Sequence, residues 1–142
     1  MTLLVDASAR SLALRRDVEA SEPEVLQLKD ALFGPEVVVT TGLVLQELLQ
    51  GFSGPRAQAQ IVERFAAPPL LRPDREDHVG AATLRDACRR AGVQVGTIDA
   101  LLAQLCIRHD LTPLATGRDF TRVARHCPLR VWPAGARARR DA

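Results

Sequence analysis

Short apolar runs and longer stretches of helical periodicity alternate along the chain. The apolar or β-branched runs predict strands over residues 2–6, 37–40, 70–71, 112–116 and 129–132. Between them, apolar positions at helical spacing predict helices over residues 9–16, 23–32, 43–50, 56–66, 74–91, 98–108 and 119–124. This alternation favours an α/β fold, a three-layer α/β/α sandwich with a central, mostly parallel sheet. Right-handed crossovers place the carboxyl ends of the strands along one edge, where such sheets bind ligands.

Size and composition indicate one globular domain. The chain has 142 residues, of which 46% are hydrophobic, enough to bury a core. We expect a single domain over residues 1–133 and a disordered, Arg-rich tail over residues 134–142. The apolar runs are shorter than the ~20 residues that a membrane span needs, and the N-terminus does not resemble a signal peptide. We therefore expect a cytoplasmic protein with no membrane partner.

The spacing of the cysteines and the distribution of charge exclude only a few kinds of functional site. Cys88, Cys106 and Cys127 form no C-x-x-C pair, which argues against a disulfide framework and a structural zinc site. The net charge is +2, but residues 72–142 carry 13 basic and 8 acidic groups, against 6 and 9 in residues 1–71. Nearly all the basic residues are arginine, whose planar fork suits phosphate. A GC-rich genome explains the arginine content equally well.

Three acids follow strands or open apolar helices, and each also has an ordinary explanation. Asp6 ends the first apolar run, where an aspartate often forms a turn or caps a helix, although Ser8 offers a second capping oxygen. Glu47 falls on a polar arc of its helix and can be a solvated side chain. Asp99 lies on the apolar arc between Ala103 and Cys106, where a carboxylate must be paired, protonated or bound to a metal. Its ordinary role is to interact with the helix dipole.

Four segments carry a resemblance to a known family. They run from Leu3 to Ser8, from Val39 to Gly51, from Thr97 to Ala103 and from Leu114 to Phe120. In this order they resemble the PIN-domain ribonucleases, and most of all the VapC-like toxins of bacterial type II toxin–antitoxin pairs. The resemblance implies a PIN-like parallel sheet with an acidic pocket at its carboxyl edge. It also implies Mg²⁺ or Mn²⁺ in that pocket and endonucleolytic hydrolysis of RNA.

The resemblance assigns roles to the acids. Asp6, Glu47 and Asp99 match the catalytic acids of the family, and we expect Asp6 and Asp99 to contact the metal. Glu47 would hold a metal-bound water and accept its proton. The family has its fourth acid where this chain has Gly117, so we expect Asp119 to replace it or only to cap the next helix.

The resemblance also suggests contacts and partners. The predicted substrate-binding groups are the Thr116 hydroxyl and the side chains of Arg10, Arg108 and Arg118. VapC-like toxins form homodimers and bind a small VapB-like antitoxin in a groove between helices. The residues that could line such a groove here are Leu12, Leu14, Val44, Leu48 and Phe52. Packing in the core explains these apolar residues equally well. An aromatic content of 4% favours recognition of RNA by backbone and shape. The alternative function is a catalytically silent PIN-like module that binds protein or RNA.

Overall fold

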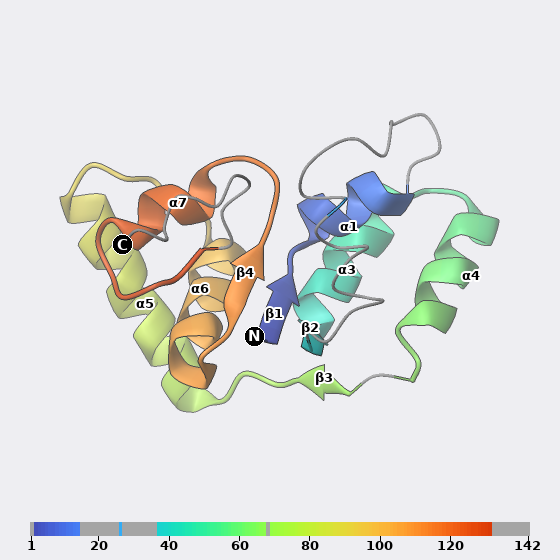
Figure 1. Ribbon diagram of the computed structural model, residues 1–142, viewed down its shortest axis with the longest axis horizontal. Coiled ribbons are helices and arrows are strands. Elements are labelled where there is room, and N and C mark those ends of the chain that lie inside the picture. The colour runs from blue at the N-terminus through green and yellow to red at the C-terminus, as the bar shows by residue number, and fades with distance from the viewer. Residues whose placement is uncertain (1, 15–25, 27–36, 68, 132–142) are drawn as a thin grey trace.

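The computed structural model describes residues 2–14, 26, 37–67 and 69–131 (Figure 1). The helices are α1 (Ala7–Leu14), α3 (Gly42–Gly51), α4 (Pro55–Arg64), α5 (Arg75–Arg90), α6 (Thr97–His109) and α7 (Asp119–Ala124). The strands are β1 (Thr2–Val5), β2 (Val37–Thr41), β3 (Leu70–Leu71) and β4 (Thr112–Leu114). Among these helices, none combines the length and the apolar character that crossing a bilayer requires.

All four strands form one parallel sheet in the order β3-β2-β1-β4. The central strand is β1, in which Leu3 pairs with Val38 of β2 on one side and with Thr112 of β4 on the other. Because the strands are parallel, their carboxyl ends lie at one edge, toward the top of Figure 1. The predicted α/β fold with a parallel central sheet is confirmed.

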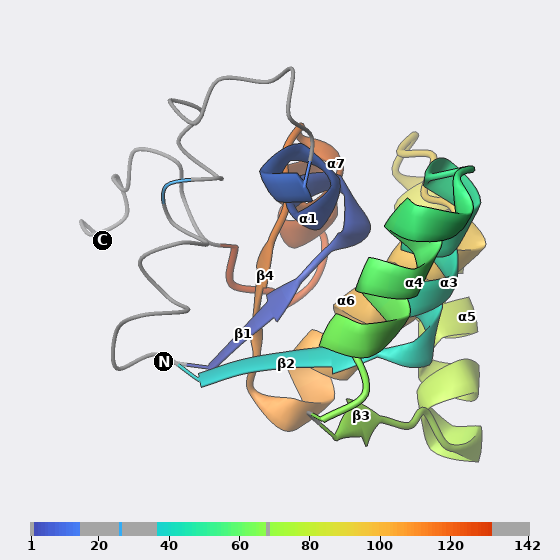
Figure 2. The same cartoon turned by 90° about the vertical axis from the view of Figure 1, so that its right-hand side faces the viewer.

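The side chains of β1 alternate between two apolar clusters, one on each face of the sheet. Leu4 joins the larger cluster, which also contains buried residues of α3, α5, α6 and α7. Leu3 and Val5 join the smaller one with Ala9 of α1 and Leu114 of β4. Figure 2 shows α3, α4, α5 and α6 gathered on one side of the strands. This division into two faces gives the expected α/β/α arrangement and leaves the ends of the strands between the helix layers.

Helices α5 and α6 pack closely as an antiparallel pair. Gly80 lets them approach, since a β-carbon at this position would lie 2.4 Å from Nε2 of Gln104. The start of α5 is fixed by a capping box, in which Asp74 and Asp77 each accept a hydrogen bond from the other's backbone N–H. Arg108, near the end of α6, contacts the carboxylates of both residues, at 2.6 Å and 3.0 Å. This ion-pair network joins the two helices at the end away from the strand carboxyl termini.

Several predicted boundaries shift in the structure. Helix α1 begins at Ala7, two residues earlier than expected, because Asp6 and not Ser8 occupies the position before its first turn. The predicted strand over residues 129–132 is wrong for residues 129–131, which pair with no strand of the described chain. Leu129 is nevertheless buried and Val131 packs against the core, so loop packing explains their apolar character. The tail 134–142 and the predicted helix 23–32, except Leu26, lie outside the described residues.

Candidate active site: acids at the carboxyl edge of the sheet

Four acids come from four different elements at this edge. Asp6 follows β1, Glu47 lies in the second turn of α3, which follows β2, and Asp99 is the third residue of α6. Asp119 is the first residue of α7, a short helix that begins five residues after β4. The capping of α3 helps to orient Glu47, because Thr41 at the end of β2 accepts a 3.2 Å hydrogen bond from the N–H of Val44.

Three of these acids act electrostatically on the fourth, Asp99. Burial is the main reason that the pKa of Asp99 is raised to about 6. The remaining causes are the negative charges of three other acids, which are Asp6, Asp119 and Glu47. Exposed charges are largely screened beyond about 8–10 Å, so these carboxylates lie close enough to Asp99 to repel it. Sequence positions separated by more than a hundred residues therefore contribute to one acidic cluster.

Glu47 belongs to the same cluster and is not an ordinary solvated side chain. It is half-buried, and its pKa is raised, first by burial and then by the charge of Asp6. A raised pKa makes this carboxylate a better proton acceptor near neutral pH than an exposed glutamate.

The carboxylate of Asp6 is held on one oxygen and left without a hydrogen-bond partner on the other. Oδ2 accepts a 2.9 Å hydrogen bond from Ser8 Oγ and a longer one, 3.4 Å, from the Ser8 N–H. Ser8 Oγ in turn accepts a 3.1 Å hydrogen bond from the N–H of Thr116, which follows β4. Oδ1 is buried and has no hydrogen-bond partner among the described residues. A buried carboxylate oxygen in this state needs a cation or a bound water.

Ser8 is the site residue that sequence reasoning missed. The sequence predicts it as a helix cap that leaves Asp6 free, whereas it binds the Asp6 carboxylate directly and links it to the turn after β4. The available signal was the spacing, because the side chain of an aspartate commonly bonds the backbone N–H two residues on.

The predicted fourth acid is present but more exposed than the others. Gly117 has a φ of +84°, a conformation that residues with a β-carbon adopt only with strain, and it turns the chain from β4 into α7. This turn brings the exposed Asp119 into electrostatic reach of Asp99, while Thr116 is half-buried beside Ser8. Asp119 therefore lies at the exposed rim of the cluster, within electrostatic reach of Asp99.

The predicted substrate-binding arginines lie in three different environments. The guanidinium of Arg10 lies over the ring of Phe65, 5.0 Å from its centre, and burial lowers its pKa to about 10. Its Nε is buried without a hydrogen-bond partner in the described part of the chain. Arg118 is exposed next to Asp119. The prediction for Arg108 is wrong, because nine residues of α6, about 13 Å of helix, separate it from Asp99 and its guanidinium pairs with acids at the start of α5.

The residues present fit a magnesium or manganese ion, with most of its shell supplied by water. No three His, Cys, Asp or Glu side chains within residues 2–14, 37–67 and 69–131 lie close enough to hold an ion by themselves. Mg²⁺ however binds proteins through one or two carboxylates and keeps several waters. The donors are all oxygens, one of them the unpartnered Asp6 Oδ1, and the cluster carries excess negative charge. Two carboxylates such as Asp6 and Asp99 are sufficient for this kind of site.

The cysteines and the predicted groove are largely structural. Burial, with a smaller contribution from the charge of Asp6, raises the pKa of Cys106 to about 12, and Cys88 is buried too. Val44 and Leu48 are fully buried core residues, so they cannot line an antitoxin groove as expected. Phe52 is half-buried against the same core, and the side chains of Leu12 and Leu14 lie outside the described residues.

Comparison with known proteins agrees with this architecture. Residues 3–126 match the PIN domain family. The fold is similar to that of FitAcB from Neisseria gonorrhoeae, with 18% identity over 93% of this chain and 97% of that one and a TM-score of 0.70. For VapBC2 from Rickettsia felis, bound to a promoter DNA fragment, the identity is 15% over 94% and 100% of the two chains and the TM-score is 0.73.

A third similar structure is VapC20 from Mycobacterium tuberculosis, a toxin that cleaves the sarcin–ricin loop. It is 20% identical over 90% of this chain and 98% of that one, with a TM-score of 0.65. At these identities the solved structures establish the fold, while the family match spans most of the sequence. The chain belongs to the PIN domain family.

Proposed function

We propose that this protein is a metal-dependent endoribonuclease that acts as the toxin of a toxin–antitoxin pair. The observation that carries the proposal is the convergence on Asp99 of charges from Asp6, Glu47 and Asp119. Acids from distant segments repel one another, so their assembly at the ligand-binding edge of the sheet is unfavourable without a cation. Phosphodiester hydrolysis is a reaction that such a cation promotes, because negative charge builds on the phosphate oxygens.

Each acid has a distinct role in this proposal. Asp6 and Asp99 would hold Mg²⁺ or Mn²⁺, and Ser8 would keep the Asp6 carboxylate oriented through its hydrogen bond to Oδ2. When held by these two carboxylates, such an ion would neutralise charge on the phosphate and would lower the pKa of a nearby water. Glu47 would take the proton from the attacking water, whose oxygen forms a bond to phosphorus while the bond to the leaving oxygen breaks. Asp119 would add negative charge at the rim and help to retain the ion.

Substrate contacts and partners complete the proposal. Arg118 and the Thr116 hydroxyl lie beside the acids in the turn after β4, where they can contact phosphates next to the cleaved bond. Arg10 needs an anionic partner for its buried guanidinium, which a phosphate can supply. The similarity to VapBC2 supports a small VapB-like antitoxin as the partner, and the similarity to VapC20 supports an RNA substrate. The proposal also includes a homodimer that acts in the cytoplasm.

The decisive experiment compares cleavage of a structured RNA by the wild type and by carboxamide variants. The purified protein is incubated with a labelled RNA hairpin in Mg²⁺, in Mn²⁺ and in EDTA. We expect cleavage only with metal, and a loss of at least 100-fold in Asp6→Asn and Asp99→Asn. Asp110→Asn is the matched control, because Asp110 is exposed at the far end of α6 and asparagine tolerates its left-handed conformation. Equal activity in all three variants would contradict the proposal.

The second candidate is a silent PIN-like binding module. It is favoured by Gly117, which replaces an acid of the family. It is also favoured because, in the described ranges, no three His, Cys, Asp or Glu side chains lie close enough to hold an ion by themselves. Metal-induced stabilisation separates the two candidates. Free Mn²⁺ at 100 times its Kd stabilises a one-site protein by about 2.7 kcal/mol, visible as a rise in Tm. A silent module would show neither this rise nor cleavage.

A further inference from the structure

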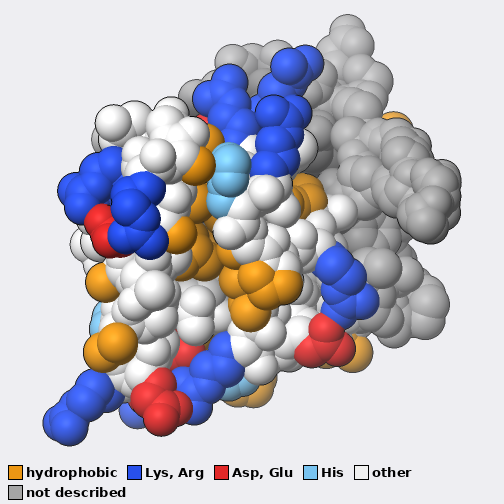
Figure 3. Space-filling view, turned by 90° about the vertical axis from the view of Figure 1, so that its left-hand side faces the viewer, with side chains coloured by type: hydrophobic (Ala, Val, Ile, Leu, Met, Phe, Trp, Pro, Cys, Tyr) orange, Lys and Arg blue, Asp and Glu red, His pale blue; other side chains and the backbone are white. Residues whose placement is uncertain are grey.

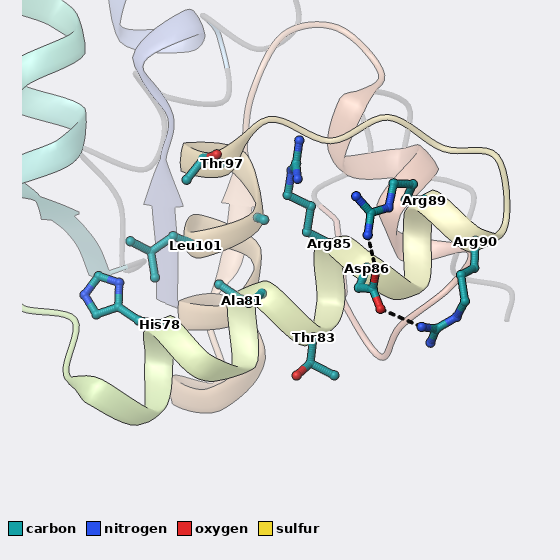
Figure 4. A pocket seen from close by; sticks show the side chains of 11 residues that line it. His78, Ala81, Thr83, Arg85, Asp86, Arg89, Arg90, Thr97 and Leu101 are labelled. Atoms are coloured by element: carbon teal, nitrogen blue, oxygen red, sulfur yellow. Dashed lines mark hydrogen bonds and ion pairs between the residues drawn. The ribbon is translucent and has the colours of Figure 1, made fainter.

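A groove on the described surface lies on the other side of α6 from Asp99. It has a volume of about 610 Å³ and runs between α5 and the first turns of α6. We call it the α5–α6 groove and define it by Arg85, Asp86, Arg89, Arg90, Thr97 and Leu101. Figure 4 shows the arginines extending from α5, and Thr97 and Leu101 on the neighbouring helix α6.

The α5–α6 groove has an excess of positive charge. Arg89 and Arg90 share a single carboxylate, since their guanidinium groups contact the two oxygens of Asp86 at 2.5 Å and 2.6 Å. Both arginine side chains remain well exposed, at 63% and 69%, so most of their N–H donors face solvent. With Arg85 included, three guanidinium groups and one carboxylate leave a net charge of +2 in the groove.

Arg85 is held in place before any ligand binds. Its Nε donates a 2.7 Å hydrogen bond to the carbonyl of Val95, in the loop that leads into α6. This bond fixes the guanidinium at the groove end nearest Thr97 and leaves its Nη groups as further donors (Figure 4). Figure 3 looks onto the side of the molecule that carries α5 and shows basic side chains covering more of it than acidic ones. A polyanion approaching this side therefore meets donors that are already oriented.

The groove and the acidic cluster meet at the start of α6. Thr97 lines the groove, and Asp99 lies two residues further on, which is a rotation of 200° around the helix axis. The two residues thus face opposite sides of the same helix end, a distance of about 10–12 Å across the helix. Gly96 precedes Thr97, and within the described chain nothing lies within 4 Å of where its β-carbon would be. An RNA strand can pass over this open start of α6, from the acids into the groove.

We propose that the α5–α6 groove binds backbone phosphates of the RNA strand that flanks the cleaved bond. This inference rests on the proposed ribonuclease function. The acidic cluster repels the substrate, so binding requires cations nearby, and the groove supplies three guanidinium groups on the far side of the helix that carries Asp99. Arginine forks match phosphate oxygens in pairs, and the one aromatic side chain that lines the groove, His78, lies at the end away from Arg89 and Arg90 (Figure 4). The arginine end of the groove therefore suits the phosphate backbone.

The test removes two groove arginines and compares the result with an equal loss of charge elsewhere. The variant is Arg89→Gln/Arg90→Gln, and the control is Arg56→Gln/Arg64→Gln on α4, at the opposite end of the molecule from α5 (Figure 1). All four arginines are exposed, so both proteins should fold, which circular dichroism and a thermal melt check. Arg89→Lys/Arg90→Lys keeps the charge and removes the fork, which separates general attraction from paired phosphate contacts.

Binding is measured by fluorescence anisotropy with a labelled RNA hairpin in EDTA, and cleavage is measured with Mn²⁺. We expect the Gln pair to raise the Kd about tenfold and to reduce the salt dependence of log Kd by about 1.4, with the Lys pair intermediate and the control near wild type. In cleavage, KM should rise while kcat changes little. If the Gln pair bound the RNA hairpin as tightly as the wild type does, the inference would be overturned. Absence of cleavage by the wild type would refute the ribonuclease function instead.

Discussion

Ser8 joins Asp6 to the turn after the neighbouring strand β4, because its hydroxyl donates to Asp6 Oδ2 and accepts from the N–H of Thr116. The bond crosses from the end of β1 to the turn after β4, the two strands that lie side by side in the sheet. One hydroxyl therefore couples the position of a carboxylate to the position of a loop 108 residues away in sequence.

Ser8→Ala should weaken both metal binding and stability. The variant leaves the half-buried N–H of Thr116 without its partner and frees one oxygen of Asp6, at a cost of about 1–2 kcal/mol in the free energy of unfolding. The Mn²⁺ Kd, measured by the rise in Tm with metal concentration, should increase. Ser8→Thr keeps the hydroxyl and is the control. An unchanged Mn²⁺ Kd in Ser8→Ala would show that the hydrogen bond does not position Asp6.

Asp99→Asn should stabilise the metal-free protein at pH 7 while it removes activity. The folded-state pKa of Asp99, about 6, lies above the ordinary value of 3.8, so ionisation of this group opposes folding. Replacing the charged group at pH 7 should raise the free energy of unfolding by about 1–3 kcal/mol, measured by urea denaturation in EDTA.

The pH dependence of this gain provides its control. In the wild type, stability rises as the pH falls through 6, because the folded state then takes up a proton that the unfolded state binds only near pH 3.8. The advantage of Asp99→Asn should therefore shrink steadily between pH 7 and pH 4. A gain of equal size at both pH values would mean that the charge of Asp99 is not its cause.

Asp119→Asn should reduce cleavage less than Asp6→Asn and should also shift the pH profile. Its charge is one of the causes that raise the pKa of Asp99, so its removal lowers that pKa. The acid limb of the log kcat/KM profile should move to lower pH, while the rate at pH 8 falls by about tenfold. If the two variants lost the same amount of activity, Asp119 would be as important for cleavage as Asp6 and would not be a peripheral acid. A profile identical to the wild type would remove Asp119 from the site.

Arg108→Met should lower the Tm more than Arg130→Met. Arg108 contacts Asp77, whose side chain is only 1% exposed, so its removal leaves a buried carboxylate oxygen without its cation. Arg130 pairs with Asp110 where both side chains are well exposed, and such pairs contribute little. Thermal melts of the two variants give the comparison, and similar Tm values would show that the ion pair does not hold α5 to α6.

Local patterns predict the elements but not the contacts between them. The apolar runs locate β1, β2, β3 and β4, and the apolar arc of α6 by itself singles out Asp99. The role of Ser8 could not be predicted, because its partner Thr116 is remote in sequence. Helix periodicity places Arg108 on the solvent side of α6, which suggests a substrate contact, whereas α5 covers that position with acids. Leu129 resembles a strand residue because burial by a loop and burial in a sheet leave the same apolar signature.

The order of the acids along the chain has a consequence for synthesis. Asp6 is translated early, but the Ser8 hydroxyl that binds its carboxylate is itself held by the N–H of Thr116. The acidic neighbours of Asp6 include Asp99 and Asp119, which also come later in the chain. A polypeptide still growing on the ribosome thus carries an incomplete centre until its last fifth has emerged and β4 has docked beside β1. In the proposed ribonuclease, RNA near the ribosome therefore meets no complete acidic centre until β4 has docked beside β1.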